Sequence, residues 1–193
     1  MEIDFSDKKP DIRYLDDMRM VLSDKEWAKT APNLELYNMY RSLETKDGVR
    51  YDITVIPPAM LGDEFVKTKG HEHLNNRGEI YIVLEGQAIY LMQRRTEDHV
   101  DDAYAVKAKK GDVVIIPPLY GHTTINPSNE TLKMGNWIAS ECKNYFAFFE
   151  KMQGACYYYT KNGWVKNEAY KDAPALRYEE PSKSLPEDLN FLK

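Results

Sequence analysis

The sequence predicts an all-β domain whose strands close into a barrel or pack as a sandwich. Short runs rich in Val, Ile, Tyr, Phe and Thr follow one another from residue 34 to about residue 160. Gly, Asn, Asp and Pro separate these runs, as is typical of turns between short strands. Many runs alternate apolar and polar residues, which directs one set of side chains into a core and the other outward. We therefore expect residues 1–193 to form one domain with a barrel core at about 34–160.

The expected elements begin with a short helix. Ser23 and Asp24 can cap the segment LSDKEWAKTA, and Pro32 ends it, so the first thirty or so residues are predicted to be peripheral. The final stretch, from about residue 167, is polar and charged, and we expect it to wrap the surface as irregular chain or short helix. Between them, the predicted strands are ELYNMYRSL, RYDITVI, DEFVKT, EIYIVLE, QAIYLMQ, YAVKAK, DVVIIP, HTTIN, TLKMGNWI, YFAFF and ACYYYT.

Composition excludes several classes of function. A formal net charge of -5 argues against a general nucleic-acid surface, which needs clustered basic residues. No apolar run approaches the roughly 20 residues of a membrane span, and the N-terminus lacks a secretory pattern, so we expect a cytoplasmic protein without membrane contact. The two cysteines, Cys142 and Cys156, are too few for a disulfide framework. Outward-facing aromatic residues on the strands favour a homodimer.

Three of the four histidines fall in two short segments, GHEHLNNRGEIYIVLEG (70–86) and GDVVIIPPLYGHTTIN (111–126). On a strand, residues i and i+2 point to the same side, so His71 and His73 present two imidazoles side by side. Glu79 begins the next strand after a five-residue connection and can face them. His122, after the turn residues 117–121, can supply a third imidazole. His99 lies in the charged segment TEDHVDD and is expected to be solvated.

This combination predicts a metal site. A single histidine in a strand is more often a hydrogen-bonded core residue, but the pair, the following glutamate and the distant histidine occur together here. Three imidazoles and one carboxylate suit one divalent first-row ion per subunit, with Fe2+ the first expectation and Mn2+, Ni2+, Co2+ or Zn2+ the alternatives. Four protein ligands leave coordination positions open for a substrate if the ion is octahedral.

The two segments resemble the paired motifs of the cupin superfamily. Its first motif places a glycine, an HxH pair, a glutamate and a second glycine in order, and here six residues separate Glu79 from Gly86. Its second motif places five residues between a glycine and a proline, as between Gly111 and Pro117, followed by a histidine and an asparagine, here His122 and Asn126. Leu119 replaces the usual second glycine. The resemblance implies a double-stranded β-helix, or jelly-roll, barrel, but cupins host many reactions.

A narrower resemblance covers roughly residues 34–145. The segment TVIPPAMLGDEFVKTKGHEH (54–73), with Glu79, Tyr81, Gln93, the prolines before His122, and Asn126, is similar to the cupin-type phosphoglucose isomerases of archaea and some bacteria. The resemblance implies that Thr54, Thr68 and Gly70 hold the substrate phosphate, with Tyr37 nearby and Tyr145 at a matching tyrosine. It assigns the ion to His71, His73, Glu79 and His122. Where the family carries a GHDY-like segment, this chain reads ECKNYF, so Lys143 stands where a histidine is expected.

Local chemistry agrees with a phosphate near this segment. On a regular strand, Thr68 and Gly70 would point to one side and His71 and His73 to the other. We therefore expect a break in this alternation near Gly70, where glycine accommodates a bulge. Lys67, Lys69 or Arg77 could supply local positive potential. The alternative is that Thr54 and Thr68 are ordinary β-branched strand residues and that the lysines form a solvated face.

The resemblance implies a metal-dependent glucose-6-phosphate isomerase that interconverts glucose 6-phosphate and fructose 6-phosphate. Glu79 is the candidate catalytic base, and Tyr81, two residues further on the same face, could relay protons. A hydride shift between the two carbons would need no base, and the sequence leaves both mechanisms open. The rival functions are another metal-dependent cupin enzyme, such as a dioxygenase or a different sugar isomerase or epimerase, and a non-catalytic sugar-binding cupin.

Overall fold

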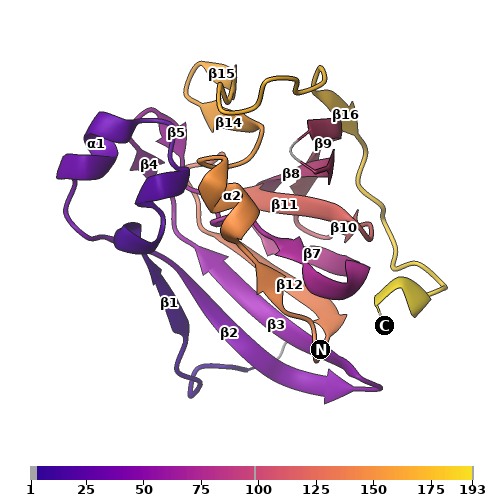
Figure 1. The fold of residues 1–193 in the computed structure, drawn as a ribbon. Coiled ribbons are helices and arrows are strands. Elements are labelled where there is room, and N and C mark those ends of the chain that lie inside the picture. The colour runs from indigo at the N-terminus through magenta and orange to yellow at the C-terminus, as the bar shows by residue number, and fades with distance from the viewer. Residues whose placement is uncertain (1–3, 98, 193) are drawn as a thin grey trace.

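A computed structural model describes residues 4–97 and 99–192 (Figure 1). The strands are β1 (Asp11–Tyr14), β2 (Glu35–Lys46), β3 (Val49–Ile56), β4 (Met60–Leu61), β5 (Glu64–Phe65), β6 (Glu72–His73), β7 (Glu79–Glu85), β8 (Gln87–Thr96), β9 (His99–Lys109), β10 (Val113–Ile116), β11 (Tyr120–Ile125), β12 (Leu132–Ala139), β13 (Asn144–Tyr145), β14 (Tyr157–Thr160), β15 (Gly163–Lys166) and β16 (Arg177–Glu179). The helices are α1 (Lys25–Thr30) and α2 (Ala147–Lys151), with 3-10 turns at Leu15–Asp17, Arg19–Val21, Leu74–Asn76 and Asn190–Leu192.

The strands form a jelly-roll barrel of two sheets. One sheet has the order β1-β2-β3-β12-β7-β10 and the other β11-β8-β9-β16, and nearly all pairs are antiparallel. The main core cluster takes Ile56, Val83 and Leu132 from the first sheet and Tyr90 and Met92 from the second. The two sheets therefore pack face to face around one apolar interior, which confirms the all-β fold class predicted from the alternating runs.

The helix predicted after Ser23 is confirmed as α1. Asp24 is its N-cap, and the Asp24 side chain accepts a 2.9 Å hydrogen bond from the Trp27 amide. α1 lies at the end of the molecule that carries β4 and β5 (Figure 1). The rest of the first thirty residues is not peripheral as predicted. β1 joins the edge of the six-stranded sheet, and the turns after it bury Leu15 and Met18 completely in the main apolar core.

The strand predicted for the run YFAFF is wrong. Tyr145 ends β13, and α2 begins at Ala147. A short apolar run has no periodicity that separates a buried strand from a buried helix turn. Here the helical turn buries Phe148 and Phe149 against the second core cluster, together with Met152. In the C-terminal stretch, β16 adds a parallel strand to β9 within chain that is otherwise irregular, as expected for this part.

Candidate metal centre

The chain segment that carries the first two histidines runs alongside β11. The His71 amide donates to the His122 carbonyl at 3.1 Å, and the His122 amide donates back to the His71 carbonyl at 2.9 Å. Gly70 lies just before this pairing with a φ of +82°, which favours glycine. A Cβ at Gly70 would also lie 2.5 Å from Cδ1 of Phe149. The predicted break in alternation at Gly70 is therefore present, and it brings the histidines of both motifs together.

The four predicted ligands form one cluster. Their candidate ligand atoms all lie within 4.8 Å of one another. The Nε2 atoms of His71 and His73 are 3.2 Å apart, as the i, i+2 spacing predicts. Oε2 of Glu79 lies 3.3 Å from Nε2 of both His73 and His122. Side chains from β6 and the residue just before it, from β7 and from β11 thus converge on one point.

The electrostatics of the cluster favour an ionised carboxylate at its centre. Burial, with the imidazoles of His122 and His73, holds the pKa of His71 well below its usual range. Burial of Glu79 favours its neutral form, but the contacts with His122 and His73 outweigh burial and lower the pKa of the carboxyl. Burial likewise opposes protonation of His73, but its contact with Glu79 prevails and raises the pKa of His73. Three imidazoles therefore surround an ionised carboxylate.

The residues fit a divalent ion on two structural grounds. Oε2 of Glu79 is buried and has no hydrogen-bond partner among the described residues, although an isolated buried carboxylate oxygen is costly. Nδ1 of His73 lies 2.9 Å from the Arg77 carbonyl, which can only accept, so Nδ1 is the donor and the Nε2 lone pair points into the cluster. The four side chains are accordingly a candidate site for one divalent metal ion.

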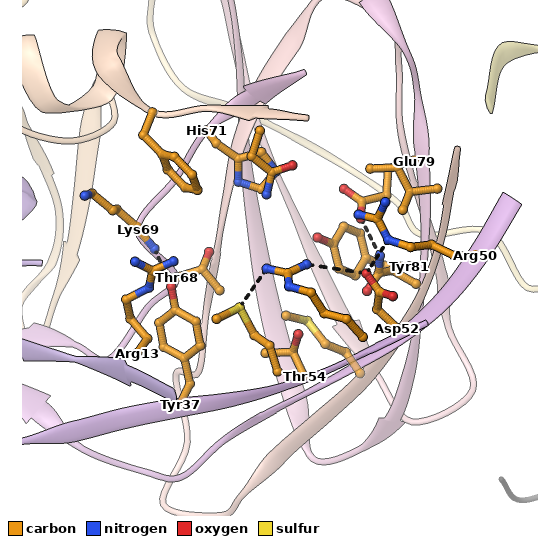
Figure 2. Close-up of a pocket in the computed structure, with 17 residues that line it drawn as sticks. Arg13, Tyr37, Arg50, Asp52, Thr54, Thr68, Lys69, His71, Glu79 and Tyr81 are labelled. Carbon is orange, nitrogen blue, oxygen red and sulfur yellow. Dashed lines mark hydrogen bonds and ion pairs between the residues drawn. The ribbon is translucent and has the colours of Figure 1, made fainter. Parts of the chain in front are cut away.

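A cavity opens beside the cluster on the inner face of the six-stranded sheet (Figure 2). Its walls follow from strand register, because alternate residues of paired strands share one face. Asp52, Asn136 and Tyr81 lie in one cross-strand row of β3, β12 and β7. The cavity is lined by Arg13, Tyr37, Met39, Arg41, Arg50, Asp52, Thr54, Thr68, Lys69, His71, Glu79, Tyr81, Met134, Asn136, Ile138, Asn144 and Phe146.

Most residues predicted to bind substrate lie in this cavity. Tyr37, Thr54 and Thr68 line it, and so does Tyr81, which was predicted to be catalytic. Burial and the nearby Glu79 carboxylate raise the pKa of Tyr81 well above its usual value, and its hydroxyl lies 3.3 Å from Nε2 of His122. Gly70 is not among the lining residues, and neither is Tyr145, whose flanking residues Asn144 and Phe146 do line the cavity.

The lysine at the unusual motif position lies outside the cavity lining. Lys143 is exposed, and its backbone carbonyl accepts a 3.1 Å hydrogen bond from the Leu74 amide. Of the three cations expected to supply positive potential, the cavity lining includes only Lys69. Lys67 is buried with Nζ 2.8 Å from Glu64 Oε2, and Arg77 pairs with Glu141 at 2.7 Å. These two cations therefore serve ion pairs elsewhere.

Sequence reasoning missed several polar groups of the cavity. Asn136 donates a 2.6 Å hydrogen bond from Nδ2 to Oε1 of Glu79 and so fixes the carboxylate from the neighbouring strand. Asp52 is 3% exposed and accepts from Arg50 Nε at 3.0 Å and from the Ser42 amide at 2.7 Å. Asn136 and Asp52 face inward within otherwise apolar strand runs. Polar residues at core-facing positions were the available signal.

A family model described as Glucose-6-phosphate isomerase (GPI) matches residues 8–175, which is most of the chain. The chain belongs to the glucose-6-phosphate isomerase family. A glucose-6-phosphate isomerase of Thermococcus litoralis is 32% identical over 128 residues, which cover 63% of this chain and 65% of the relative. That of Pyrococcus horikoshii is 33% identical over 125 residues, which cover 62% of this chain and 64% of the relative. The chain thus spans slightly less than two thirds of the length of these glucose-6-phosphate isomerases.

Among solved structures, a predicted oxalate decarboxylase of Thermotoga maritima is similar to this glucose-6-phosphate isomerase family member at 20% identity, with a TM-score of 0.47. That match covers 72% of this chain and 98% of the other. No helix in residues 4–97 and 99–192 is long and apolar enough to span a membrane.

Proposed function

We propose that this protein is a metal-dependent glucose-6-phosphate isomerase that interconverts glucose 6-phosphate and fructose 6-phosphate. The observation that carries the proposal is the cluster of His71, His73, Glu79 and His122, which opens onto a cavity lined by cations and hydroxyl groups. Metal ligands beside a polar, cation-lined cavity suit a substrate that has sugar oxygens at one end and a phosphate at the other. Membership of the glucose-6-phosphate isomerase family supports the same reaction.

The chain's own residues supply the proton chemistry in this proposal. A bound divalent ion, with Fe2+ expected first and Mn2+, Ni2+, Co2+ or Zn2+ as alternatives, supplies Lewis-acid stabilisation of negative charge on the substrate oxygens. Glu79, ionised at neutral pH because its pKa is lowered, acts as the base that removes the hydrogen from C2 and returns it to C1, while the proton of the O2 hydroxyl passes to O1. Asn136 holds one oxygen of that carboxylate, which fixes its orientation. Tyr81 stays protonated because its pKa is raised, so it can donate a hydrogen bond.

The substrate phosphate is proposed to lie away from the metal ligands, near Tyr37, Thr54 and Thr68. Figure 2 shows Thr68 beside Tyr37 and Lys69, at the end of the cavity opposite Glu79 and Tyr81. The Tyr37 hydroxyl accepts a 3.2 Å hydrogen bond from the Lys69 amide, which orients the phenol. Gly70 and Tyr145 stay in the proposal. Gly70 would contact the phosphate through its backbone, and Tyr145 would reach it after a change of its side-chain position on binding.

The test is conversion of fructose 6-phosphate to glucose 6-phosphate by purified protein. The protein is stripped with a chelator and reloaded separately with Fe2+, Mn2+, Ni2+, Co2+ or Zn2+, and bound ion is measured in each sample. We expect turnover to disappear on stripping and to return with at least one ion. Full ion loading without turnover would exclude the isomerase. Oxygen uptake would then point to a dioxygenase, and saturable sugar binding without product to a binding module.

A homodimer and a cytoplasmic location complete the proposal. An apolar surface near the end of the chain supports a dimer, because Val49, Trp137, Leu185 and Leu189 line one hollow, in which Leu185 is 49% and Leu189 42% exposed. Light scattering on a size-exclusion column is the test. A mass of twice 22.5 kDa is expected, and a monomer mass at micromolar concentration would exclude the dimer.

A further inference from the structure

Four cationic side chains line the cavity, and three of them are already neutralised. Arg41 Nε lies 3.1 Å from Asp11 Oδ2. Arg50 Nε lies 3.0 Å from Asp52 Oδ2, and Lys69 Nζ lies 2.6 Å from Glu150 Oε1. Each of these three cations would have to leave a carboxylate before it could bind an anionic ligand at full strength.

The fourth cation, Arg13, has a different environment. The nearest carboxylate oxygen recorded for it is Asp17 Oδ2 at 4.0 Å, the limit of an ion pair, and the Asp17 side chain is 45% exposed. Nε of Arg13 is buried and has no hydrogen-bond partner among the residues that the structure describes. An uncompensated guanidinium nitrogen shielded from water is costly unless a ligand satisfies it. The guanidinium of Arg13 also contacts the neutral Tyr37 hydroxyl, but it has no close carboxylate among the described residues, so Arg13 stands out among the four as the cation available to a ligand.

The surroundings of Arg13 suit a phosphate. In the β1–β2 pair, Arg13 is the cross-strand partner of Tyr37, whose hydroxyl lies beside Thr68 and Lys69 in Figure 2. The Arg13 guanidinium carbon is 5.7 Å from the centre of the Phe146 ring, and the same ring lies 5.6 Å from that of His71. Phe146 thus lies between the Arg13 cation and the candidate metal ligands. In a bound sugar phosphate, the sugar would likewise lie between the phosphate and the reacting carbons.

We propose that Arg13 recognises the substrate phosphate and determines selectivity for phosphorylated over unphosphorylated sugar. This inference rests on the proposed isomerase function. The planar guanidinium offers paired donors that match two phosphate oxygens, which a lysine cannot reproduce. In a chain of net charge -5, such a localised cation supplies the attraction that the overall charge does not.

The experiment compares Arg13→Gln and Arg13→Lys with the ion-loaded parent enzyme. Arg94→Gln is the matched control, because Arg94 pairs with Asp101 on the β8–β9 hairpin and does not line the cavity. The KM for fructose 6-phosphate should rise about 10- to 100-fold in Arg13→Gln, the loss expected for one hydrogen-bonded charge pair, while kcat changes less than about threefold. Arg13→Lys should recover part of the loss. Any turnover of unphosphorylated fructose should be the same in parent and variants.

Binding of inorganic phosphate, measured by calorimetry on the same proteins, separates the two proposals. An active parent enzyme whose KM and phosphate affinity are unchanged in Arg13→Gln would overturn the role of Arg13 and leave the isomerase intact. An inactive parent enzyme would reject the isomerase proposal. If, in addition, phosphate binding were absent, or equal in parent and Arg13→Gln, the role of Arg13 in phosphate binding would be rejected as well. If Arg13→Gln does not fold, Arg13→Lys carries the test, and an unchanged KM there would overturn the proposal.

Discussion

Asn136 holds Glu79 by a 2.6 Å hydrogen bond from Nδ2 to Oε1, which leaves Oε2 directed at the histidines. Groups that orient a metal ligand commonly change ion affinity about 10- to 100-fold when they are removed. We expect Asn136→Ala to weaken ion binding by that factor without unfolding the protein, as measured by competition with a chelator. The exposed Asn162→Ala is the control. An unchanged ion affinity would mean that Asn136 contributes only to the structure of the sheet and does not orient Glu79 for ion binding.

Glu79→Gln tests proton transfer. The amide keeps the size of the side chain but cannot accept the proton, so kcat at saturating ion should fall about 10²- to 10⁴-fold. Bound ion has to be measured in the same sample, because Glu79 is also a proposed ligand. A variant that keeps both its ion and near-normal turnover would exclude Glu79 as the base. Product formed in D2O without deuterium at C1 or C2 would favour the hydride shift instead.

Ion occupancy should fall in acid. Imidazoles bind metal only when neutral, so lowering the pH releases the ion as protons compete for the ligands. In the ion-free protein, the Glu79 carboxylate raises the pKa of His73 and burial lowers that of His71, so His73 is the first to be protonated as pH falls. Because the pKa of His73 is raised, we expect bound ion and turnover to begin to decline together above the usual imidazole value of about 6.5 and to fall further as pH is lowered. Turnover that persists after the ion has gone would contradict an essential metal.

The buried pair of Lys67 and Glu64 should contribute strongly to stability. Nζ of Lys67 also donates to the Val21 carbonyl at 2.9 Å, which ties the N-terminal turns to the barrel. Lys67→Met leaves Glu64 buried without its cation, so the free energy of unfolding should fall by about 3–5 kcal/mol in urea denaturation. Lys161→Met, which breaks an exposed pair with Asp63, should cost less than about 1 kcal/mol. Equal losses would contradict the importance of the buried pair.

Gly70→Ala separates backbone strain from steric contact. Gly111 has a similar φ of +91°, but a Cβ there would meet nothing within 4 Å, so Gly111→Ala should cost only the left-handed strain of about 1–2 kcal/mol. Gly70→Ala adds the clash with Phe149, which should cost a further 1–3 kcal/mol or so. Urea unfolding of both variants measures the difference. If the two variants lose the same free energy of unfolding, the Phe149 side chain moves aside without an energetic penalty.

The four candidate metal ligands were predictable because two short sequence motifs carry them. The i, i+2 spacing of His71 and His73 fixes their common side on any strand, and the glycines and prolines around His122 indicate where its strand begins. Thr54 and Thr68 were found through family resemblance, since β-branched residues are ordinary in strands. The strand alternation of the central runs likewise predicted the barrel.

Arg13, Arg50 and Asp52 were not predictable in the same way. Their position in the cavity depends on the register of β1 against β2 and of β3 against β12, which no pattern within a single strand specifies. Asp52 became a core residue because Arg50 and the Ser42 amide satisfy it. For YFAFF, the choice between strand and helix was made by tertiary packing of Phe148 and Phe149.

The attachment of β1 to the edge of the sheet adds to the cavity wall a stretch of chain that is far in sequence from the candidate metal ligands. Residues 11–14 reach the barrel by pairing with β2, whereas the candidate metal ligands come from the middle of the sequence. A chimera that replaces this N-terminal strand with that of a relative could therefore alter which sugars are accepted and leave the chemistry at the ion untouched. Substrate choice and catalysis could then diverge through different regions of the same gene.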